Sequence, residues 1–149
     1  MRRVACALSL TVLLAAAGCG DDVDVELVWG GPPDPSGGGV VSVNGFAAYQ
    51  ENVDEHWERS AVMAAAEFLR LDTRTAVSTT VEGKAAAEGR GSQTVTVTLD
   101  GLLDDSVRAE RWKLAFEEED GVYRLTAVLR EQRCQRGRGH QDFSPEPCL

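Results

Sequence analysis

Residues 92–133, SQTVTVTLDGLLDDSVRAERWKLAFEEEDGVYRLTAVLREQR, contain three segments in which apolar and polar residues alternate. The segments are 92–99, 107–117 and 122–133, and the turn-forming run Glu-Asp-Gly at 119–121 separates the last two. Alternation with a period of two predicts strands that bury one face, and short turns between such strands predict an antiparallel sheet. The side chains predicted to face the core are Val95, Val97, Leu99, Trp112, Leu114, Phe116, Tyr123, Leu125, Ala127 and Leu129.

Upstream of this region, residues 75–82 (TAVSTTVE) are rich in β-branched side chains and predict a fourth strand. Residues 46–71 repeat apolar side chains at steps of three or four, which is typical of an amphipathic helix. Asn44 is suited to cap the start of this helix, and Ser60 is suited to cap a second one, so the helix is either continuous or kinked near Ser60. The predicted apolar stripe consists of Phe46, Tyr49, Val53, Trp57, Ala61, Ala64, Phe68 and Leu71.

Residues 44–133 are therefore predicted to form an α+β domain, in which one long helix, continuous or kinked, packs on a curved antiparallel sheet of about four strands. In the order of its elements, this domain resembles the nuclear transport factor 2-like superfamily, whose members are cone-shaped α+β domains. Cystatin-like domains share the same order and are the alternative. The resemblance implies a fold without fixing an activity, because cone-shaped domains of this kind include both binding proteins and enzymes.

The start of the chain, MRRVACALSLTVLLAAAGCG (1–20), predicts where the protein is located. Arg2 and Arg3 precede an apolar run that is too short to span a bilayer and that ends in small residues directly before Cys19. This resembles the lipobox of bacterial lipoproteins, which implies a signal peptide over 1–18 and a lipid on Cys19. Ordinary signal-peptidase cleavage and an uncleaved anchor are the alternatives.

The lipobox implies that the domain is anchored to the cell membrane and faces outside the cytoplasm, at the cell surface or in the periplasm. Two further segments, 99–107 and 134–148, look like those of uncharacterised bacterial lipoproteins. Residues 19–43 then form a Gly- and Pro-rich tether, in which the alternating stretch 23–29 predicts an additional edge strand.

Removing residues 1–18 from 149 leaves 131, which is enough for one domain with its own core. Two arginines are lost with the signal, so Lys and Arg fall from 15 to 13 against 24 Asp and Glu, and the net charge changes from −9 to −11. This acidic balance argues against nucleic acid as a partner. The expected partners are the membrane, through the lipid, and an unidentified envelope protein or ligand.

The four cysteines have different expected fates. Cys6 is removed with the signal and Cys19 carries the lipid, so Cys134 and Cys148 remain as an even pair in an exported chain, which predicts a disulfide. Closing this loop would stabilise the fold by roughly 3 kcal/mol. A zinc site formed by Cys134, His140 and Cys148 is the alternative, but it needs reduced thiols and lacks a clear fourth ligand. No metal and no cofactor are expected.

The best candidate binding residues lie in the C-terminal tail, 134–149. Arg136, Arg138 and His140 are separated by glycines and are candidates for converging on an anion. The favoured interpretation is a solvated, disulfide-closed tail in which the arginines pair with acidic residues such as Asp142 and Glu146. A catalytic dyad of His140 and Asp142 is a weaker hypothesis, because two residues of a loop at this spacing say little about geometry.

Other polar clusters are interpreted as structural. The spacing of Asp100, Asp104 and Asp105 does not fit a calcium-binding EF-hand loop, and Asp104 or Asp105 is predicted to cap the local backbone. His56 is predicted to be solvated or structural. The chain lacks the G-x-S-x-G, G-x-x-x-x-G-K-[ST] and H-E-x-x-H motifs, and no catalytic residue is assigned.

These observations favour a non-catalytic binding or interaction module of the cell envelope. The alternative is a small enzyme with a pocket between helix and sheet. Since all the predicted inward positions are apolar, the strand patterns argue for a filled core or an apolar pocket and against acid–base chemistry.

Overall fold

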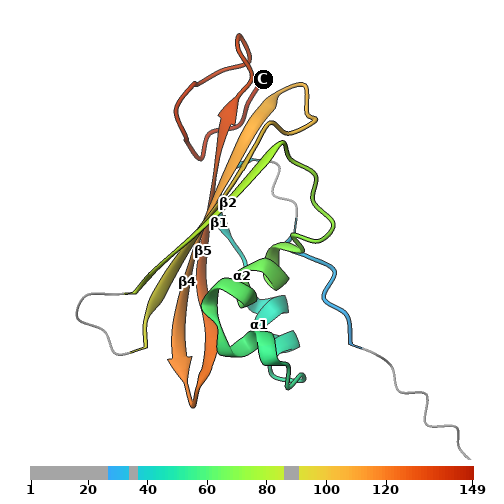
Figure 1. The fold of residues 1–149 in the computed structure, drawn as a ribbon. Coiled ribbons are helices and arrows are strands. Elements are labelled where there is room, and N and C mark those ends of the chain that lie inside the picture. Colours follow the sequence, from blue (N-terminus) through green and yellow to red (C-terminus); the bar gives the residue numbers. More distant parts are fainter. Residues whose placement is uncertain (1–26, 34–36, 86–90) are drawn as a thin grey trace, which may run out of the picture.

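The computed structural model describes residues 27–33, 37–85 and 91–149 and has an α+β fold (Figure 1). Five antiparallel strands form one open sheet in the order β1-β5-β4-β3-β2, and the helices lie together on one face. The predicted class is confirmed, with five strands rather than about four. In chain order the elements are β1 (Gly39–Val41), α1 (Asn44–Gln50), the 3₁₀ helix η1 (His56–Arg59), α2 (Ala61–Leu69), β2 (Ser78–Ala85), β3 (Gln93–Asp100), β4 (Val107–Glu119) and β5 (Val122–Cys134).

The helical region is divided into three segments, so the predicted single long helix is not observed. Phe46 and Phe68 of the predicted stripe are fully buried, but the chain leaves the helical conformation at Glu55 and Ser60, where ψ is 145° and 118°. Each of these residues caps the segment that follows it. Glu55 forms a capping box with Glu58, and the Ser60 hydroxyl accepts a hydrogen bond from the first turn of α2 at 3.4 Å. The alternative of a second helix capped by Ser60 therefore describes α2.

The turn between β4 and β5 is a two-residue hairpin, as its sequence predicts. Glu119 pairs with Val122, and the two residues between them, Asp120 and Gly121, both have positive φ angles, 54° and 84°. A two-residue turn of this kind needs positive φ at both positions, for which Asp-Gly is a preferred pair. It joins the two longest strands of the sheet, each of 13 residues.

The fifth strand is not at the predicted position 23–29. Residues 27–29 are described and form no strand, whereas 23–26 lie outside the described residues. Instead β1, from the end of the tether, pairs with β5. The approach is close at Gly38, where a Cβ would lie 2.6 Å from the Cα of Pro145, so the glycine-rich sequence is what allows the tether to lie on the sheet.

β5 contains a β-bulge that the sequence pattern does not predict. Ala115 of β4 pairs with Ala127, but its neighbour Phe116 pairs with Leu125, which leaves Thr126 without a partner. A bulge reverses the face to which the following residues point. The buried residues after the bulge are Val128, Arg130, Gln132 and Cys134, in place of the predicted Ala127 and Leu129.

The core lies between the helices and the inner face of the sheet, and the tether helps to close it. Trp29 contacts the rings of Phe46, Tyr49 and Phe68. Its indole N–H donates to the main-chain oxygen of Phe68 at 2.8 Å, and its own carbonyl accepts from Arg70 at 2.6 Å. The largest fully buried side chains are Trp112, Phe46, Phe68, Phe116, Leu69, Leu99 and Leu114.

Candidate anion-binding loop

The C-terminal tail forms a closed loop at one end of the sheet (Figure 1). β5 ends at Cys134, which is fully buried, and a disulfide joins it to Cys148. The two Cα atoms are 5.4 Å apart, within the usual range for disulfides. The predicted pairing is confirmed, and both ends of the loop are fixed at the end of a long strand.

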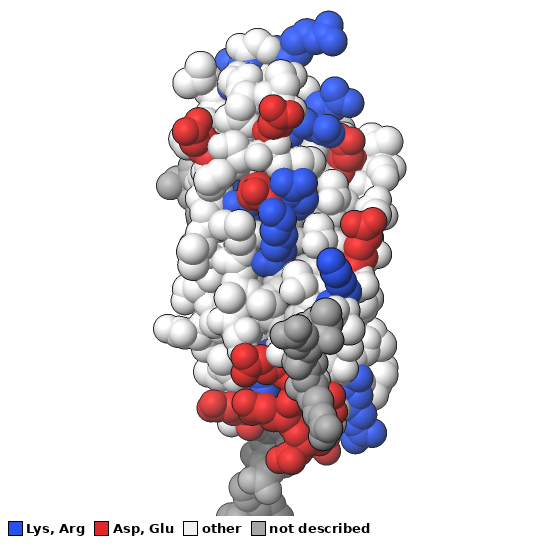
Figure 2. Space-filling view, turned by 90° about the vertical axis from the view of Figure 1, so that its left-hand side faces the viewer, with Lys and Arg blue, Asp and Glu red and all other residues white. Residues whose placement is uncertain are grey.

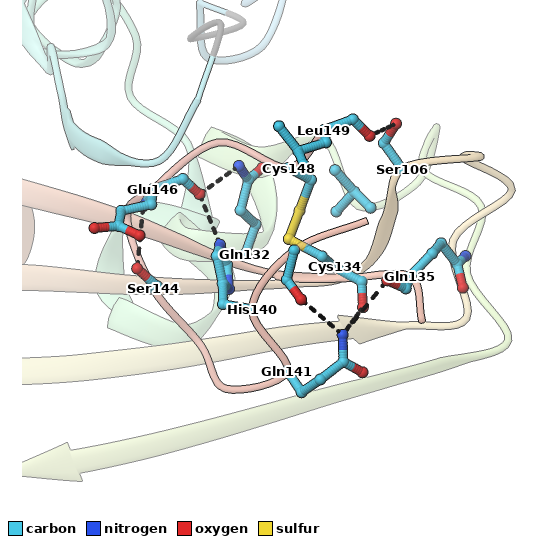
Figure 3. Close-up of a disulfide and its surroundings, with 12 residues drawn as sticks. Ser106, Gln132, Cys134, Gln135, His140, Gln141, Ser144, Glu146, Cys148 and Leu149 are labelled. Atoms are coloured by element: carbon cyan, nitrogen blue, oxygen red, sulfur yellow. Dashed lines mark hydrogen bonds between the residues drawn. A yellow bond between two sulfur atoms is a disulfide. The ribbon is translucent and has the colours of Figure 1, made fainter. Parts of the chain in front are cut away.

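Side-chain amides hold the interior of the loop in place (Figure 3). Nε2 of Gln141 lies 3.1 to 3.5 Å from three main-chain carbonyl oxygens of the loop, and Nε2 of Gln132 donates to the carbonyl of Glu146 at 2.8 Å. Gly139 has φ +136°, and a Cβ there would lie only 2.9 Å from Sγ of Cys134. The loop is therefore packed against its own disulfide.

His140 points into the loop toward the carbonyl of Glu146 (Figure 3), and both of its ring nitrogens face carbonyl oxygens. Nδ1 lies 2.8 Å from the main-chain oxygen of Asp142, and Nε2 lies 2.9 Å from that of Glu146. Two such acceptors are satisfied together only by the protonated imidazolium, which carries two N–H donors. These hydrogen bonds raise the pKa of His140 above its usual value, and the bond to the main chain of Glu146 contributes most.

The geometry therefore uses His140 to hold the loop together and does not turn it toward an external anion. The contact with Asp142 involves its main-chain carbonyl, so the structure does not show the carboxylate–histidine dyad that the sequence raised as a weaker hypothesis. Of the three candidate anion-binding residues, Arg136 and Arg138 keep donors without a partner among the described residues.

Arg136 and Arg138 lie on a tight turn of this loop. The N–H of Arg138 donates to the carbonyl of Gln135 at 2.9 Å, and Gly137, between the arginines, has φ +82°. Glycine adopts this conformation without strain at the third position of a turn. Both arginines are exposed, and neither guanidinium has a hydrogen-bond or ion-pair partner among residues 27–33, 37–85 and 91–149.

The lack of an ion-pair partner is unusual among the arginines of the described residues. Seven of the ten in the described ranges form ion pairs with carboxylates. The exceptions are the two loop arginines and Arg59, which is exposed on η1. The expected pairing of the loop arginines with Asp142 and Glu146 is not found in the part of the chain that the structure describes. The paired arginines are Arg70, Arg74, Arg108, Arg111, Arg124, Arg130 and Arg133.

Arg133, close to the loop in sequence, belongs to the outer face of the sheet. Its Nη2 donates to Asp100 at 2.9 Å, and its guanidinium carbon lies 5.1 Å from the centre of the Phe143 ring. The guanidinium of Arg111 lies 4.3 Å from the same ring. Contacts of cations with an aromatic ring are favourable, so Phe143 helps to attach the tail to the sheet.

Charge is distributed unevenly along the sheet (Figure 2). The acidic run 117–120 lies at the β4–β5 turn, at the lower end in Figures 1 and 2, where acidic residues gather. The loop with Arg136 and Arg138 lies at the opposite end. An anion that approaches the loop therefore meets cations at the end of the sheet that is remote from the acidic run.

The acidic cluster between β3 and β4 has internal partners. Asp104 accepts hydrogen bonds at 2.6 and 2.7 Å from two main-chain N–H groups just after it, and these bonds lower its pKa. Asp100 forms ion pairs with Arg108 and Arg133 at 3.6 and 2.9 Å, and Asp105 is exposed. The predicted backbone-capping role is confirmed for Asp104.

Sequence reasoning missed a group of charges buried on the inner face of the sheet. Oε1 of Glu110 accepts from Arg130 at 2.6 Å, and Oε2 accepts from Arg74 at 3.2 Å and from the indole of Trp112 at 2.9 Å. Arg130 also donates to the carbonyl of Gly37 at 2.9 Å. Alternation in residues 107–117 places Glu110 on the same face as Trp112, but alternation without a bulge places Arg130 on the outer face, so the sequence pattern does not bring the two together. Both carboxylate oxygens are engaged, which favours a structural role.

The sequence predicts His56 to be solvated or structural, and the residue is exposed. It borders an open hollow of about 290 Å³. The hollow is lined only by residues of the helical region and the turn after it, 56–72, including Trp57, Met63 and Leu71. It is not a pocket between helix and sheet, which the enzyme hypothesis requires.

The residues of the zinc alternative are also close together. Cys134, His140 and Cys148 each offer one potential ligand atom, and these three atoms lie within 4.8 Å of one another. Zinc is bound by thiolates, and in this structure both sulfur atoms belong to the disulfide. The arrangement is therefore a covalent crosslink of the loop.

Comparison of the chain with protein-family models, curated proteins and solved structures found no match. Among the described residues, no helix is long and apolar enough to cross a membrane. Function therefore has to be inferred from the residues and their geometry.

Proposed function

We propose that this chain is a lipid-anchored binding module of the bacterial cell envelope, which binds an anionic ligand through Arg136 and Arg138. One observation carries the proposal: these two guanidinium groups are exposed without a described partner, on a loop whose ends and interior are fixed. His140 is left out of the binding group because its ring is used inside the loop.

The fixed loop supports binding in two ways. Guanidinium groups form paired hydrogen bonds with phosphate, sulfate and carboxylate groups, which makes an anion the natural ligand. A loop that is already ordered by a disulfide loses less conformational entropy when it binds than a flexible tail does.

Support for the anchor comes from the sequence, since residues 1–26 lie outside the described ranges. A multiply acylated Cys19 would anchor stably, because each buried CH₂ group contributes about 0.8 kcal/mol and one chain alone binds only marginally. The Cys134–Cys148 disulfide agrees with a location outside the cytoplasm, where disulfides persist.

For the fold, we propose a cone-shaped domain of the nuclear transport factor 2-like superfamily, with a cystatin-like domain as the alternative. Support comes from the helices covering one face of the sheet and from the two long strands that close the meander. The proposal concerns architecture only, because this fold does not determine activity.

Anion binding is tested by calorimetric titration with two probes, a soluble polyanionic glycan and phosphatidylglycerol vesicles. The double variant Arg136→Ala, Arg138→Ala is expected to bind the responding probe about tenfold or more weakly, with an unchanged melting temperature. Added salt should also weaken binding by the wild type.

The matched control is Arg59→Ala, because Arg59 is also exposed and unpaired within the described ranges but lies on η1. This variant should bind like the wild type. No heat from the wild type with either probe would contradict the proposal for those ligand classes. A double variant that melts earlier but binds normally would show that the arginines are structural.

The anchor is tested by metabolic labelling with palmitate. Wild-type protein should incorporate label and partition into membranes, and Cys19→Ala should lose both properties, because the thiol is the predicted acylation site. Cys6→Ala provides the control, since Cys6 lies within the predicted signal and should not affect labelling. Label that persists in Cys19→Ala would refute the assignment.

A further inference from the structure

The two edges of the sheet differ in how they are covered. At one end, β5 is covered by the three-residue strand β1 and by an isolated bridge between Gln132 and Ser144 of the tail. At the other end, β2 is eight residues long, pairs only with β3 and is exposed along its whole length. A strand of this length that is paired on one side presents main-chain donors and acceptors to a further strand.

Two charged side chains on β2 restrict which strand can pair with it. The register with β3 places Glu82 opposite Thr96 and Lys84 opposite Thr94, so both charges lie on the outer face of the sheet. Charges on an edge strand usually suppress pairing with other chains. In this strand they have opposite signs and flank Gly83, so another copy of the same strand can neutralise both.

The geometry of antiparallel pairing selects one register. In an antiparallel pair, two residues that lie opposite each other point to the same face of the sheet. When the two strands are identical and related by a twofold axis, the axis therefore passes beside one residue, which lies opposite its own copy. With the axis at Gly83, Glu82 of each chain lies opposite Lys84 of the other, and Val81 lies opposite Ala85. With the axis at Glu82, the two Glu82 carboxylates would lie opposite each other. With the axis at Val81, Glu82 and Lys84 would each lie opposite an uncharged residue. Only the register centred on Gly83 pairs opposite charges.

Apolar side chains on the inner side of β2 favour the same axis. Val62 of α2 lies over Gly83, since a Cβ on Gly83 would be 3.2 Å from Cγ2 of Val62. Val62 and Val81 are large apolar residues that are each 38% exposed. Adjacent strands are only about 4.8 Å apart, so pairing at Gly83 would bring the two copies of Val62 together and remove them from water.

We propose that β2 pairs with β2 of a second copy of this chain about a twofold axis at Gly83. The product is a dimer with a continuous ten-stranded antiparallel sheet, five strands from each chain, and with two Glu82–Lys84 pairs across the axis. This interface is separate from the disulfide loop, which contributes no residue to β2, so dimerisation and anion binding can be tested independently.

The test is sedimentation velocity of the full exported chain in a density-matched nonionic detergent. Wild-type protein should sediment with the protein mass of two chains. Glu82→Lys and Lys84→Glu should each associate about tenfold or more weakly, because each change converts both attractive pairs into repulsive ones. The double variant Glu82→Lys, Lys84→Glu should recover the dimer, because it restores opposite charges in the same register.

Mixing the two single variants gives the sharpest result. One chain then carries two lysines and the other two glutamates, so the equimolar mixture should form a mixed dimer although neither variant dimerises alone. Glu117→Lys is the control, since Glu117 is exposed on β4, away from the β2 edge. Circular dichroism should show that every variant is folded.

Two outcomes would overturn the proposal. A wild type that remains monomeric would leave β2 free for a strand of a different protein. A dimer that survives both single charge changes would place the interface elsewhere on the molecule.

Discussion

A histidine among arginines and glycines suggests a ligand for an anion or a metal, but the chemistry of a side chain depends on what its atoms face. Both nitrogens of His140 face main-chain carbonyl oxygens, whereas the neighbouring guanidinium groups of Arg136 and Arg138 have no described partner. Residue type alone does not separate these roles. The separation comes from the disulfide, which folds the tail back so that the carbonyl of Glu146 reaches the ring.

The two hydrogen bonds of His140 predict that stability depends on pH. The pKa of His140 is raised in the folded protein above its usual 6.5, so the stabilisation is complete below that value and is lost as the pH rises through the folded-state pKa. The melting temperature of the wild-type protein should therefore fall as the pH rises from about 6.5, a region in which carboxylates do not normally titrate. His140→Ala should lack most of this fall.

His56 supplies the comparison, since it is exposed and makes no contact with the loop. His56→Ala should keep the pH dependence of the wild type. An identical fall in His140→Ala and wild type would show that the imidazolium does not stabilise the loop.

Among the elements, β5 determines where the inner face of the sheet carries apolar side chains and where it carries polar or charged ones. Its bulge at Thr126 changes the phase of the strand, so the half before the bulge contributes apolar side chains and the half after it contributes Arg130 and Gln132. The carboxylate of Glu110 on β4 then becomes the partner of Arg130 at 2.6 Å. A single unpaired residue thus turns part of an apolar face into a charged one.

This cluster predicts a large effect of one substitution. Glu110→Ala should lower the free energy of unfolding by about 3 to 5 kcal/mol, because it leaves the buried guanidinium of Arg130 without its carboxylate. Urea denaturation with circular dichroism detection measures the change. Glu117→Ala on the same strand is exposed and should change stability by no more than about 0.5 kcal/mol. A loss below about 1 kcal/mol in Glu110→Ala would contradict a stabilising role for the cluster.

For the whole molecule, local sequence patterns predict the class and the meander but not the long-range contacts. The strands of residues 75–133 and the Asp-Gly hairpin could be predicted because alternation and turn chemistry are local properties. The break between α1 and α2 depends on caps at Glu55 and Ser60, which compete with an equally good helical stripe. The position of β1 depends on where the chain can approach β5, and no local pattern records that.

The candidate site divides in the same way. The disulfide could be predicted because only Cys134 and Cys148 remained for pairing, and the cationic tail was visible in composition. The inward turn of His140 could not be predicted, because it depends on carbonyl groups that a folded loop brings to the ring. The pairing of Glu110 with Arg130 could not be predicted either, since one bulged residue determines on which face Arg130 lies.

The position of Trp29 has a mechanical consequence for an anchored protein. A force applied through a lipid on Cys19 would travel along the chain and reach Trp29 before any helix or strand of the described residues, because Trp29 precedes β1. Before the load passes beyond Trp29, the indole must leave its contacts with the neighbouring rings, and the hydrogen bonds of Trp29 with Phe68 and Arg70 must break. In the proposed anchored state, tension from the membrane would thus be resisted at the entry to the domain, before the load reaches the sheet that carries the disulfide loop.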